Sequence, residues 1–232
     1  MKFSTNAILS LGLLFTLAFS SCKKDEDTDT TTPDSGTSFI SIVNASPSLA
    51  TYNFYMDNVK MNDKGALPLG GTIPYAQVKS ATYASKFTSA SSTESLLAKS
   101  LTLSSSGVYT YFLTGQSGSL EGIMIKDEIA GVTTQAAIRL VNMSPDAAAF
   151  DLVVKAGAPP VVTNQFYKSV SAFVALEPAK YTLNVVDKTG KVIATLPDVT
   201  IAAGKYYSVL VRGMQNPGNT DHPLAAQLIV NL

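Results

Sequence analysis

Most of the chain consists of short apolar and β-branched stretches separated by clusters of Gly, Pro, Asn and Ser. Stretches rich in Val, Ile, Thr and Tyr between such clusters are typical of β-strands. Residues 181–185 illustrate the pattern, because Tyr, Leu and Val alternate with Thr182 and Asn184 and so give one apolar and one polar face. The segment 187–191 contains a glycine and leads into the next apolar stretch, 192–196, so the sequence predicts a hairpin here.

An internal repeat divides the chain into two similar halves. Residues Ile40–Tyr55 align without gaps on Ile138–Val153, at an offset of 98 and with six of 16 positions identical. Most of the differing positions keep their apolar or polar character. We therefore predict two copies of one domain, at 38–130 and 136–232.

A second pair of segments supports the repeat near the end of each unit. It aligns when a gap of one residue is allowed, and the alignment then places Gly107 on Gly204 and Tyr109 on Tyr206. A tyrosine shortly after a glycine, at the start of a Tyr-rich strand, resembles the tyrosine that tethers a corner of a β-sandwich. We expect Tyr109 and Tyr206 to have this packing role.

Each copy contains about seven or eight predicted strands and no convincing long amphipathic helix. Residues 91–100 are the one ambiguous stretch, because their Ser-rich start followed by Glu94 is also compatible with a helix cap. Their counterpart in the second copy is the hairpin around Lys188, so we predict a turn followed by a strand. The pattern as a whole predicts an all-β chain of two tandem antiparallel β-sandwiches.

Both copies have an Asn-x-Ser-Pro segment at the end of the first predicted strand, at Asn44 and at Asn142. Proline cannot donate to a strand ladder, and Asn and Ser readily bond nearby backbone groups, so these segments predict turns. The Asn-x-Ser triplets also match the N-glycosylation sequence, but the turn already accounts for them.

The N-terminus has the three parts of a secretory signal peptide. Lys2 precedes an apolar stretch, 7–19, which is followed by Ser20 and Ser21 and then by Cys22, the only cysteine. The stretch is too short for a membrane-spanning helix, which needs about 20 apolar residues. The ending Phe-Ser-Ser-Cys resembles the bacterial lipobox, which implies a signal peptide at 1–21, cleavage between Ser21 and Cys22, and lipidation of Cys22.

Residues 22–37 form an acidic, Thr-rich segment without large apolar side chains after the cysteine, and such a composition predicts a flexible linker. Its acids resemble the export signal of some surface lipoproteins, although a solvated acidic linker is an equal interpretation. The remaining chain, 38–232, has 14 basic and 12 acidic residues. This near balance of charges lacks the excess of basic residues that is typical of nucleic-acid-binding proteins.

The start of each copy resembles a known family. Ser144-Pro-Asp-Ala-Ala followed by a strand with Asp151 is similar to the opening of bacterial domain-of-unknown-function family 4397 (DUF4397), and the segment from Ile40 is a weaker copy. The resemblance implies immunoglobulin-like or transthyretin-like β-sandwiches and a location in the cell envelope, but no activity. Copy one has Ser48 and Asn53 where the family has acids, so any shared function of these acids would be lost there.

His222 is the only histidine, and it lies in the turn-like segment 218–223. A Ser-His-Asp triad, a zinc site or a histidine acid–base scheme would have to use it, and the chain offers no second histidine or free cysteine as a partner. Fingerprints of nucleophile elbows, metalloprotease helices, phosphate-binding loops and dinucleotide-binding folds are absent. We therefore expect no catalytic, cofactor-binding or metal-binding residues, no cofactor and no enzyme activity.

Two pairs of carboxylates keep an enzymatic alternative open: Asp146 with Asp151, and Glu121 with Asp127. Such pairs carry out glycoside hydrolysis when they flank the scissile bond at about 5 to 10 Å from each other. Asp146 follows a Ser-Pro turn, and Asp151 alternates with apolar residues on the solvent face of a predicted strand. Structural roles are therefore the better interpretation.

Two kinds of binding surface are compatible with the sequence. Tyr52, Tyr55, Tyr75 and Tyr83 offer stacking faces for sugars, although the absence of tryptophan weakens this hypothesis. The Ser/Thr-rich region 80–106 is unusually polar, which suggests an exposed sheet edge where a partner strand can add.

These observations predict an outer-membrane lipoprotein of a Gram-negative bacterium, attached to the membrane through Cys22 and facing either the cell surface or the periplasm. We expect a non-catalytic binding or spacer role toward an envelope protein or polysaccharide, and no nucleic-acid partner. A glycan-binding surface protein is the alternative, and a carboxylate-dependent glycoside hydrolase is the least favoured hypothesis.

Overall fold

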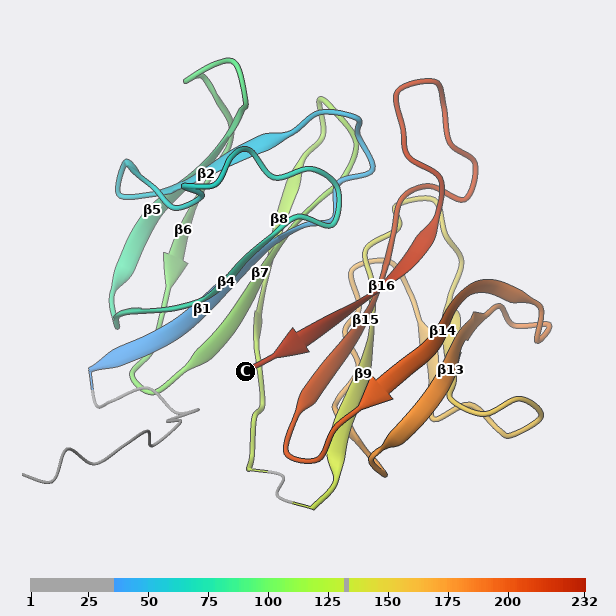
Figure 1. Ribbon diagram of the computed structural model, residues 1–232. Coiled ribbons are helices and arrows are strands. Elements are labelled where there is room, and N and C mark those ends of the chain that lie inside the picture. Colours follow the sequence, from blue (N-terminus) through green and yellow to red (C-terminus); the bar gives the residue numbers. More distant parts are fainter. Residues whose placement is uncertain (1–35, 132–133) are drawn as a thin grey trace, which may run out of the picture. The chain divides into compact units, whose positions relative to one another are not determined.

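The computed structural model describes residues 36–131 and 134–232, and all regular secondary structure in this part of the chain is β-strand (Figure 1). The predicted signal peptide, Cys22 and nearly all of the linker lie outside the described residues. The described part contains no helix with the length and hydropathy of a membrane span.

Sixteen strands of residues 36–131 and 134–232 fall into two sets of eight. The first set, blue to green in Figure 1, consists of β1 (Thr37–Asn44), β2 (Tyr52–Met56), β3 (Val59–Lys60), β4 (Thr72–Lys79), β5 (Thr82–Ser89), β6 (Ser95–Thr102), β7 (Val108–Thr114) and β8 (Glu121–Lys126). The second set, yellow-green to red, consists of β9 (Ala136–Asn142), β10 (Phe150–Val153), β11 (Val162–Gln165), β12 (Val174–Leu176), β13 (Ala179–Val186), β14 (Val192–Ile201), β15 (Tyr206–Arg212) and β16 (Ala225–Asn231).

Each set forms two four-stranded sheets with the same topology. The first copy has the orders β4-β1-β7-β8 and β3-β2-β5-β6, and the second has β12-β9-β15-β16 and β11-β10-β13-β14. Every strand thus has a counterpart eight strands later. The prediction of two tandem all-β sandwiches is confirmed, with one refinement: among the described strands, the β1–β7 and β9–β15 ladders are parallel and the others antiparallel.

The sandwich cores follow from the alternation within the strands. Along β2, Tyr52, Phe54 and Met56 point into the first core. Phe54 packs there against Phe87, with ring centroids 4.8 Å apart, and against Tyr111. In the second copy, the positions 98 residues later hold Leu152, Val185 and Val209, all of them buried. The same framework therefore accepts an aromatic core or an aliphatic one.

The two Asn-x-Ser-Pro segments are turns, as predicted, and the structure gives their physical reason. The Asn44 side chain accepts a hydrogen bond from the backbone N–H of Ser46, and the Ser46 hydroxyl donates to the carbonyl of Gly115 at 2.7 Å. The counterparts Asn142 and Ser144 make the same bonds in copy two, there to Gly213. Both asparagines are fully buried, so these triplets serve the end of a strand and offer no accessible acceptor in the folded state.

The tyrosine corner is where the sequence alignment was wrong by one residue. Tyr109 pairs with Ile40 in the β1–β7 ladder, and its counterpart opposite Ile138 is Tyr207, not Tyr206. The Tyr109 hydroxyl accepts a hydrogen bond from the backbone N–H of Ser104, and the Tyr207 hydroxyl accepts one from Ala202, both at 3.0 Å.

The offset of 98 therefore holds here without a gap. The turn that precedes β15 contains one residue with a positive φ. In copy two this residue is Gly204, whose φ is 74°. Copy one has Ser106 at that position, at 58°. Matching Gly204 with Gly107 on chemical identity shifted the alignment by one residue.

The predicted hairpin and the ambiguous segment 91–100 both have the predicted structure. Residues 179–201 form the β13–β14 hairpin with its turn at 187–191. Residues 91–100 form a turn and then enter β6. β6 lies at the edge of its sheet and is largely exposed.

Removing the corner hydroxyls tests the corrected alignment. We expect Tyr109→Phe and Tyr207→Phe each to lower the free energy of unfolding by about 1–2 kcal/mol, because a partly buried N–H loses its acceptor. Urea unfolding monitored by circular dichroism measures the change. Tyr55→Phe is the matched control, since among the described residues the Tyr55 hydroxyl has no hydrogen-bond partner. A Tyr207→Phe variant as stable as this control would contradict the assignment.

Candidate functional site

The carboxylates singled out in the sequence hold loops. Both oxygens of Asp146 accept hydrogen bonds, from the backbone N–H groups of Gln215 and Asn216, each at 2.7 Å. Asp151 accepts one from the backbone N–H of Asn164, also at 2.7 Å. The two acids therefore fix different loops, the first between β15 and β16 and the second at the β10–β11 hairpin.

Copy one keeps one of these roles with a different side chain. Asn53, the counterpart of Asp151, accepts a hydrogen bond from the side-chain amide of Asn62 and so fixes the β2–β3 hairpin. Ser48, the counterpart of Asp146, accepts one from the backbone N–H of Ala50 within its own turn. The hairpin role thus survives the exchange of acid for amide, whereas the loop role of Asp146 has no equivalent at Ser48.

The other pair, Glu121 and Asp127, is separated along one strand. Six residues of extended chain span about 20 Å, which exceeds the roughly 5 to 10 Å between paired glycosidase carboxylates. Glu121 pairs with Lys168 at 2.5 Å, and Asp127 pairs with Arg139. The two acids belong to different interactions.

His222 lies in the predicted turn, where the backbone carries its contacts. Its N–H donates to the carbonyl of Pro47 at 2.7 Å, and its carbonyl accepts from the N–H of Met214. No group of three or more metal-ligating side chains occurs among the residues that the structure describes.

A buried ion pair joins the two copies, and the sequence analysis did not anticipate it. Arg139 on β9 donates from Nη2 to Oδ1 of Asp127 at 2.6 Å, and the two side chains are 2% and 0% exposed. Arg139 also donates from Nε to the Ser208 hydroxyl at 2.8 Å, and its guanidinium lies 4.4 Å from the ring centroid of Phe173. The pair is therefore surrounded by protein on the side of copy two.

Copy one completes the network around Asp127. Its Oδ2 accepts hydrogen bonds from the hydroxyls of Tyr75, at 2.9 Å, and of Thr110, at 2.7 Å. Asn231 donates to the Tyr75 oxygen at 2.8 Å and accepts from Ser208 at 2.7 Å, which closes a ring of hydrogen bonds across both copies. Burial and the nearby Asp127 charge both raise the pKa of Tyr75. A buried pair is favourable only with such complete hydrogen bonding.

Apolar contacts accompany the ion pair. A buried cluster combines residues of both copies: Val43, Ala45 and Phe112 with Val141, Met143, Leu210 and Ile229. β7 and β9 consequently have no exposed residue, because one face of each strand packs into its own sandwich and the other into this junction. The junction-facing sides of these strands combine apolar residues with Thr110 and Arg139 of the ion-pair network.

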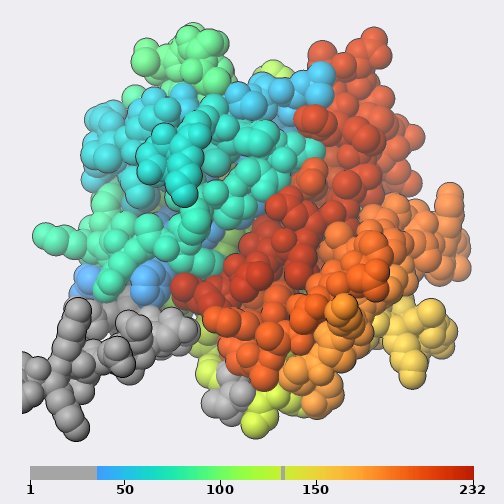
Figure 2. Space-filling model, in the orientation of Figure 1, coloured from blue at the N-terminus to red at the C-terminus, as the bar shows by residue number. Residues whose placement is uncertain are grey.

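A long loop of copy two also binds to copy one. The β15–β16 connection, 213–224, is twice as long as its counterpart 115–120. Besides the bond from His222 to Pro47, Thr220 accepts a hydrogen bond from the backbone N–H of Leu49. In Figure 2, red atoms of this loop lie against blue atoms of the first copy. The insertion in copy two therefore functions as a strap across the junction.

Equivalent depressions occur in both copies, between the β2–β3 hairpin and the β5–β6 turn and between their counterparts. The first, about 600 Å³, is lined by Asn53, Tyr55, Lys60 and the turn 90–93. The second, about 540 Å³, has among its lining residues Asp151, Val153, Ala156, Pro160, Asn184, Asp187, Lys188 and Thr189. The fold itself creates this hollow, and the two copies line it differently.

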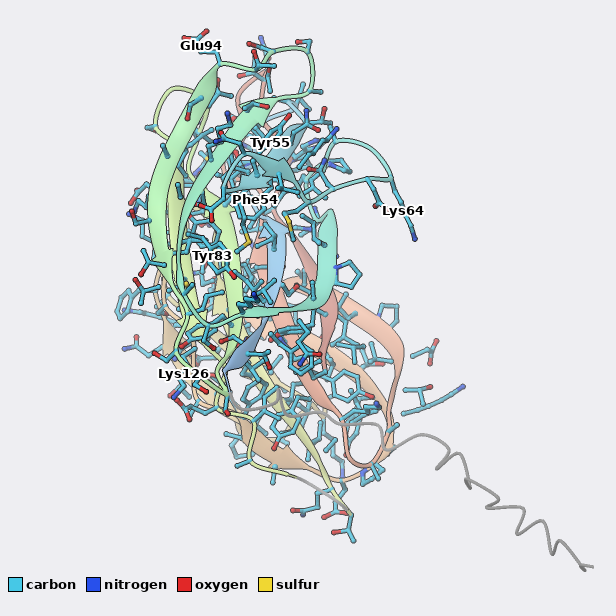
Figure 3. The ribbon with its side chains drawn as sticks, turned by 90° about the vertical axis from the view of Figure 1, so that its left-hand side faces the viewer. Phe54, Tyr55, Lys64, Tyr83, Glu94 and Lys126 are labelled. Carbon is cyan, nitrogen blue, oxygen red and sulfur yellow. The ribbon has the colours of Figure 1, made fainter. Side chains whose placement is uncertain are left out.

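The row of side chains beside the hollow distinguishes the two copies. In copy one, Tyr55 pairs with Lys60 on β3 and with Lys86 on β5, and Lys86 Nζ lies 5.2 Å from the tyrosine ring centroid. In copy two, Val153 replaces the tyrosine and pairs with Asn184. Figure 3 shows Tyr55 beside Phe54, the core residue that precedes it.

The other tyrosines considered for sugar stacking have different positions. Tyr52 is a core residue with 1% exposure, and Tyr75 belongs to the junction network, so the prediction of stacking faces is wrong for both. Tyr83 packs against the first core and donates to the carbonyl of Lys79. Strand alternation separates these cases: Tyr52 has the parity of Phe54, and Tyr55 has the opposite parity. The junction itself had one signal in the sequence: Arg139 is a charged residue between the apolar residues Ile138 and Leu140 of β9.

The family described as Domain of unknown function (DUF4397) matches the chain at residues 38–153 and 136–230. The two segments agree with the two predicted copies, and the resemblance is confirmed. No curated protein matches the sequence.

Two solved structures show some similarity. "The Bacillus anthracis TIE protein" is 13% identical, with 76% of this chain and 34% of that chain covered and a TM-score of 0.25, so this chain spans about a third of its length. CBMbc (family CBM26) from Eubacterium rectale Amy13K in complex with maltoheptaose is 10% identical, with 84% and 95% covered and a TM-score of 0.24. At these scores neither similarity carries an argument.

Breaking the ion pair on one side tests its role at the junction. We expect Arg139→Met to lower the free energy of unfolding by about 3–5 kcal/mol, because Asp127 remains buried without a counter-charge. The double variant Asp127→Leu/Arg139→Met removes both charges and should recover much of this loss. Urea unfolding of the three variants, including Asp127→Leu alone, measures the coupling. Strictly additive effects would show that the two charges do not interact.

Alkaline pH should destabilise the junction through Tyr75. Below the ordinary tyrosine pKa of 10.0 the folded and unfolded states both keep the proton, and above it the unfolded state releases the proton first, since burial raises the pKa of Tyr75 in the folded state. Stability from this group is therefore present below about pH 10 and decreases above it. Urea unfolding at pH 9 and pH 11 should show a larger decrease for the unmodified chain than for Tyr75→Phe. Equal decreases would contradict the assignment.

Proposed function

The chain belongs to the DUF4397 family, and we propose that it is a lipid-anchored protein of the cell envelope whose two sandwiches form one rigid, non-catalytic binding and spacer module. The observation that carries this proposal is the junction. Its ion pair, apolar cluster and strap join the copies through buried contacts from both. Relative domain motion is expected unless an interface is extensive and apolar, and the buried apolar cluster of the junction favours a fixed arrangement.

The sequence supplies the reason for placing the module at a membrane. The segment ending at Cys22 has the composition of a lipoprotein signal, and the acidic Thr-rich linker to residue 37 has the composition of a flexible tether. Two or three acyl chains give stable anchoring, whereas one chain binds a membrane only weakly. A tether followed by a rigid body holds binding surfaces at fixed positions relative to one another, at a variable distance from the bilayer.

A non-catalytic role agrees with the positions of the candidate catalytic groups. Asp146 and Asp151 hold separate loops, and Glu121 and Asp127 each have a partner of opposite charge. The contacts of His222 are made by its backbone. The four carboxylates thus have structural roles that require no substrate.

A role in glycan binding is the second candidate. The observation that favours it is the depression beside Tyr55, which has a partly exposed aromatic ring and a rim of amide, hydroxyl and ammonium groups. Such a combination of one flat apolar surface and several polar groups suits a sugar.

Labelling with an alkynyl palmitate in the producing bacterium tests the anchor. We expect the unmodified chain to become labelled and Cys22→Ala to remain unlabelled, because the thiol is the acceptor of the lipid. Thr28→Ala, a change in the same tether, is the matched control and should be labelled normally. Equal labelling of Cys22→Ala, or none of either chain, would overturn the proposed anchor.

Protease treatment of intact cells tests which side of the outer membrane the module faces. The tether should be cut readily, since exposed chain without packed side chains is the preferred site of proteolysis. Release of a fragment close to 38–232 supports a surface location, with a periplasmic protein as the control for lysis. Protection that disappears when the outer membrane is permeabilised supports a location facing the periplasm instead.

A further inference from the structure

We propose that the depression beside Tyr55 in copy one binds an acidic sugar unit of an anionic polysaccharide, and that the equivalent depression in copy two does not. This inference specifies the ligand class of the binding role proposed above and rests on it. It depends on the row Lys60–Tyr55–Lys86, on the polar rim of the hollow, and on the comparison with copy two.

Tyr55 provides the apolar surface. The alternation along β2 directs Tyr52 and Phe54 on either side of Asn53 into the core and leaves Tyr55 on the outer face of the sheet, partly exposed. Among the described residues its hydroxyl has no hydrogen-bond partner, so neither the ring nor the hydroxyl is required by the core. The face of an aromatic ring carries negative potential, which attracts the weakly positive C–H groups of a pyranose ring.

Two cations flank this ring. Lys60 and Lys86 lie directly opposite Tyr55 on the strands at either side, and cross-strand neighbours have Cβ atoms about 4.5–5.5 Å apart. Within the described part of the chain neither lysine forms an ion pair. Two ammonium groups beside one aromatic ring favour a sugar whose ring carries a carboxylate, and uronic acids are one class of such sugars.

The rim supplies groups for the hydroxyls of a sugar. The turn 91–93 contributes Ser91, Ser92 and Thr93 to the lining, whereas the side chain of Asn53, which also lines it, already bonds Asn62 and Ser89. The volume of about 600 Å³ lies within the range of small-ligand sites. Asp57 is turned away from this role, since its carboxylate accepts a hydrogen bond from the backbone of Ala84. Glu94 follows the turn and is not among the lining residues.

Copy two provides an internal comparison, because its fold has the same hollow with different chemistry. Val153 replaces the aromatic ring, Asn184 replaces Lys86, and Asp151 and Asp187 add negative charge. Lys188 is the one cation of that lining, and its Nζ lies 5.3 Å from the ring centroid of Phe166. Phe166 is exposed but does not line the depression, so an acidic sugar finds no aromatic ring and only one cation in the lining of copy two.

Isothermal titration calorimetry of the detergent-solubilised full chain with oligogalacturonate tests the proposal, with pullulan as the neutral probe. We expect saturable binding of oligogalacturonate and none of pullulan. Tyr55→Ala and the double variant Lys60→Ala/Lys86→Ala should each weaken binding at least tenfold. Tyr55→Phe keeps the ring and should bind normally. Val153→Ala and Lys188→Ala, at the equivalent depression, should leave binding unchanged.

The possible failures are distinguishable. Absence of oligogalacturonate binding, unchanged binding by Tyr55→Ala, or an equal loss in the copy-two variants would each overturn the acidic-sugar site. Urea unfolding of Tyr55→Ala excludes misfolding as the cause of a loss, and normal binding by Tyr55→Phe shows that the ring itself is needed. The anchored rigid module would survive any of these failures, since palmitate labelling and the Asp127–Arg139 coupling test it independently.

Discussion

The ion pair between Asp127 and Arg139 is the constraint on which the arrangement of the two copies depends. Its hydrogen-bond partners come from both copies: Tyr75 and Thr110 from the first and Ser208 from the second, with Asn231 linking Ser208 to Tyr75. The apolar cluster of the junction supplies favourable free energy for docking but has no strong directional preference. The ion pair restricts docking to one geometry, because any arrangement that buries one charge without the other is strongly unfavourable.

The two copies share one framework but differ in detail. The copies share their topology, their Asn-x-Ser-Pro turns and their tyrosine corners at a constant offset of 98. They differ at the junction and on the surface, where equivalent positions have different neighbours. The longer β15–β16 loop of copy two crosses to copy one, and the equivalent hairpin depressions have an aromatic, cationic lining in one copy and an aliphatic, more acidic lining in the other.

The division of surfaces within each copy connects this architecture to the proposed role. The sheets that contain β1 and β9 are covered at the junction, as the complete burial of β7 and β9 shows. The opposite sheets carry the hairpin depressions at one end and remain accessible there. Docking through one sheet of each copy leaves the other sheet accessible, and under the proposed function a lipid-anchored tether would present that surface to a ligand.

The sequence by itself determined the strands, the hairpin at 179–201, the turns after Asn44 and Asn142, the two-copy organisation and the family, since alternation, turn chemistry and repetition are local properties of the chain. Tertiary structure decided which side of a strand is covered. A shift of one residue moves a side chain to the other face, so the alignment that matched Tyr109 with Tyr206 instead of Tyr207 selected the wrong side of β15. Partners that approach from another copy leave almost no local signal, so the burial of Tyr75 and the pairing of Asp127 with Arg139 emerged only when the sheets were packed together.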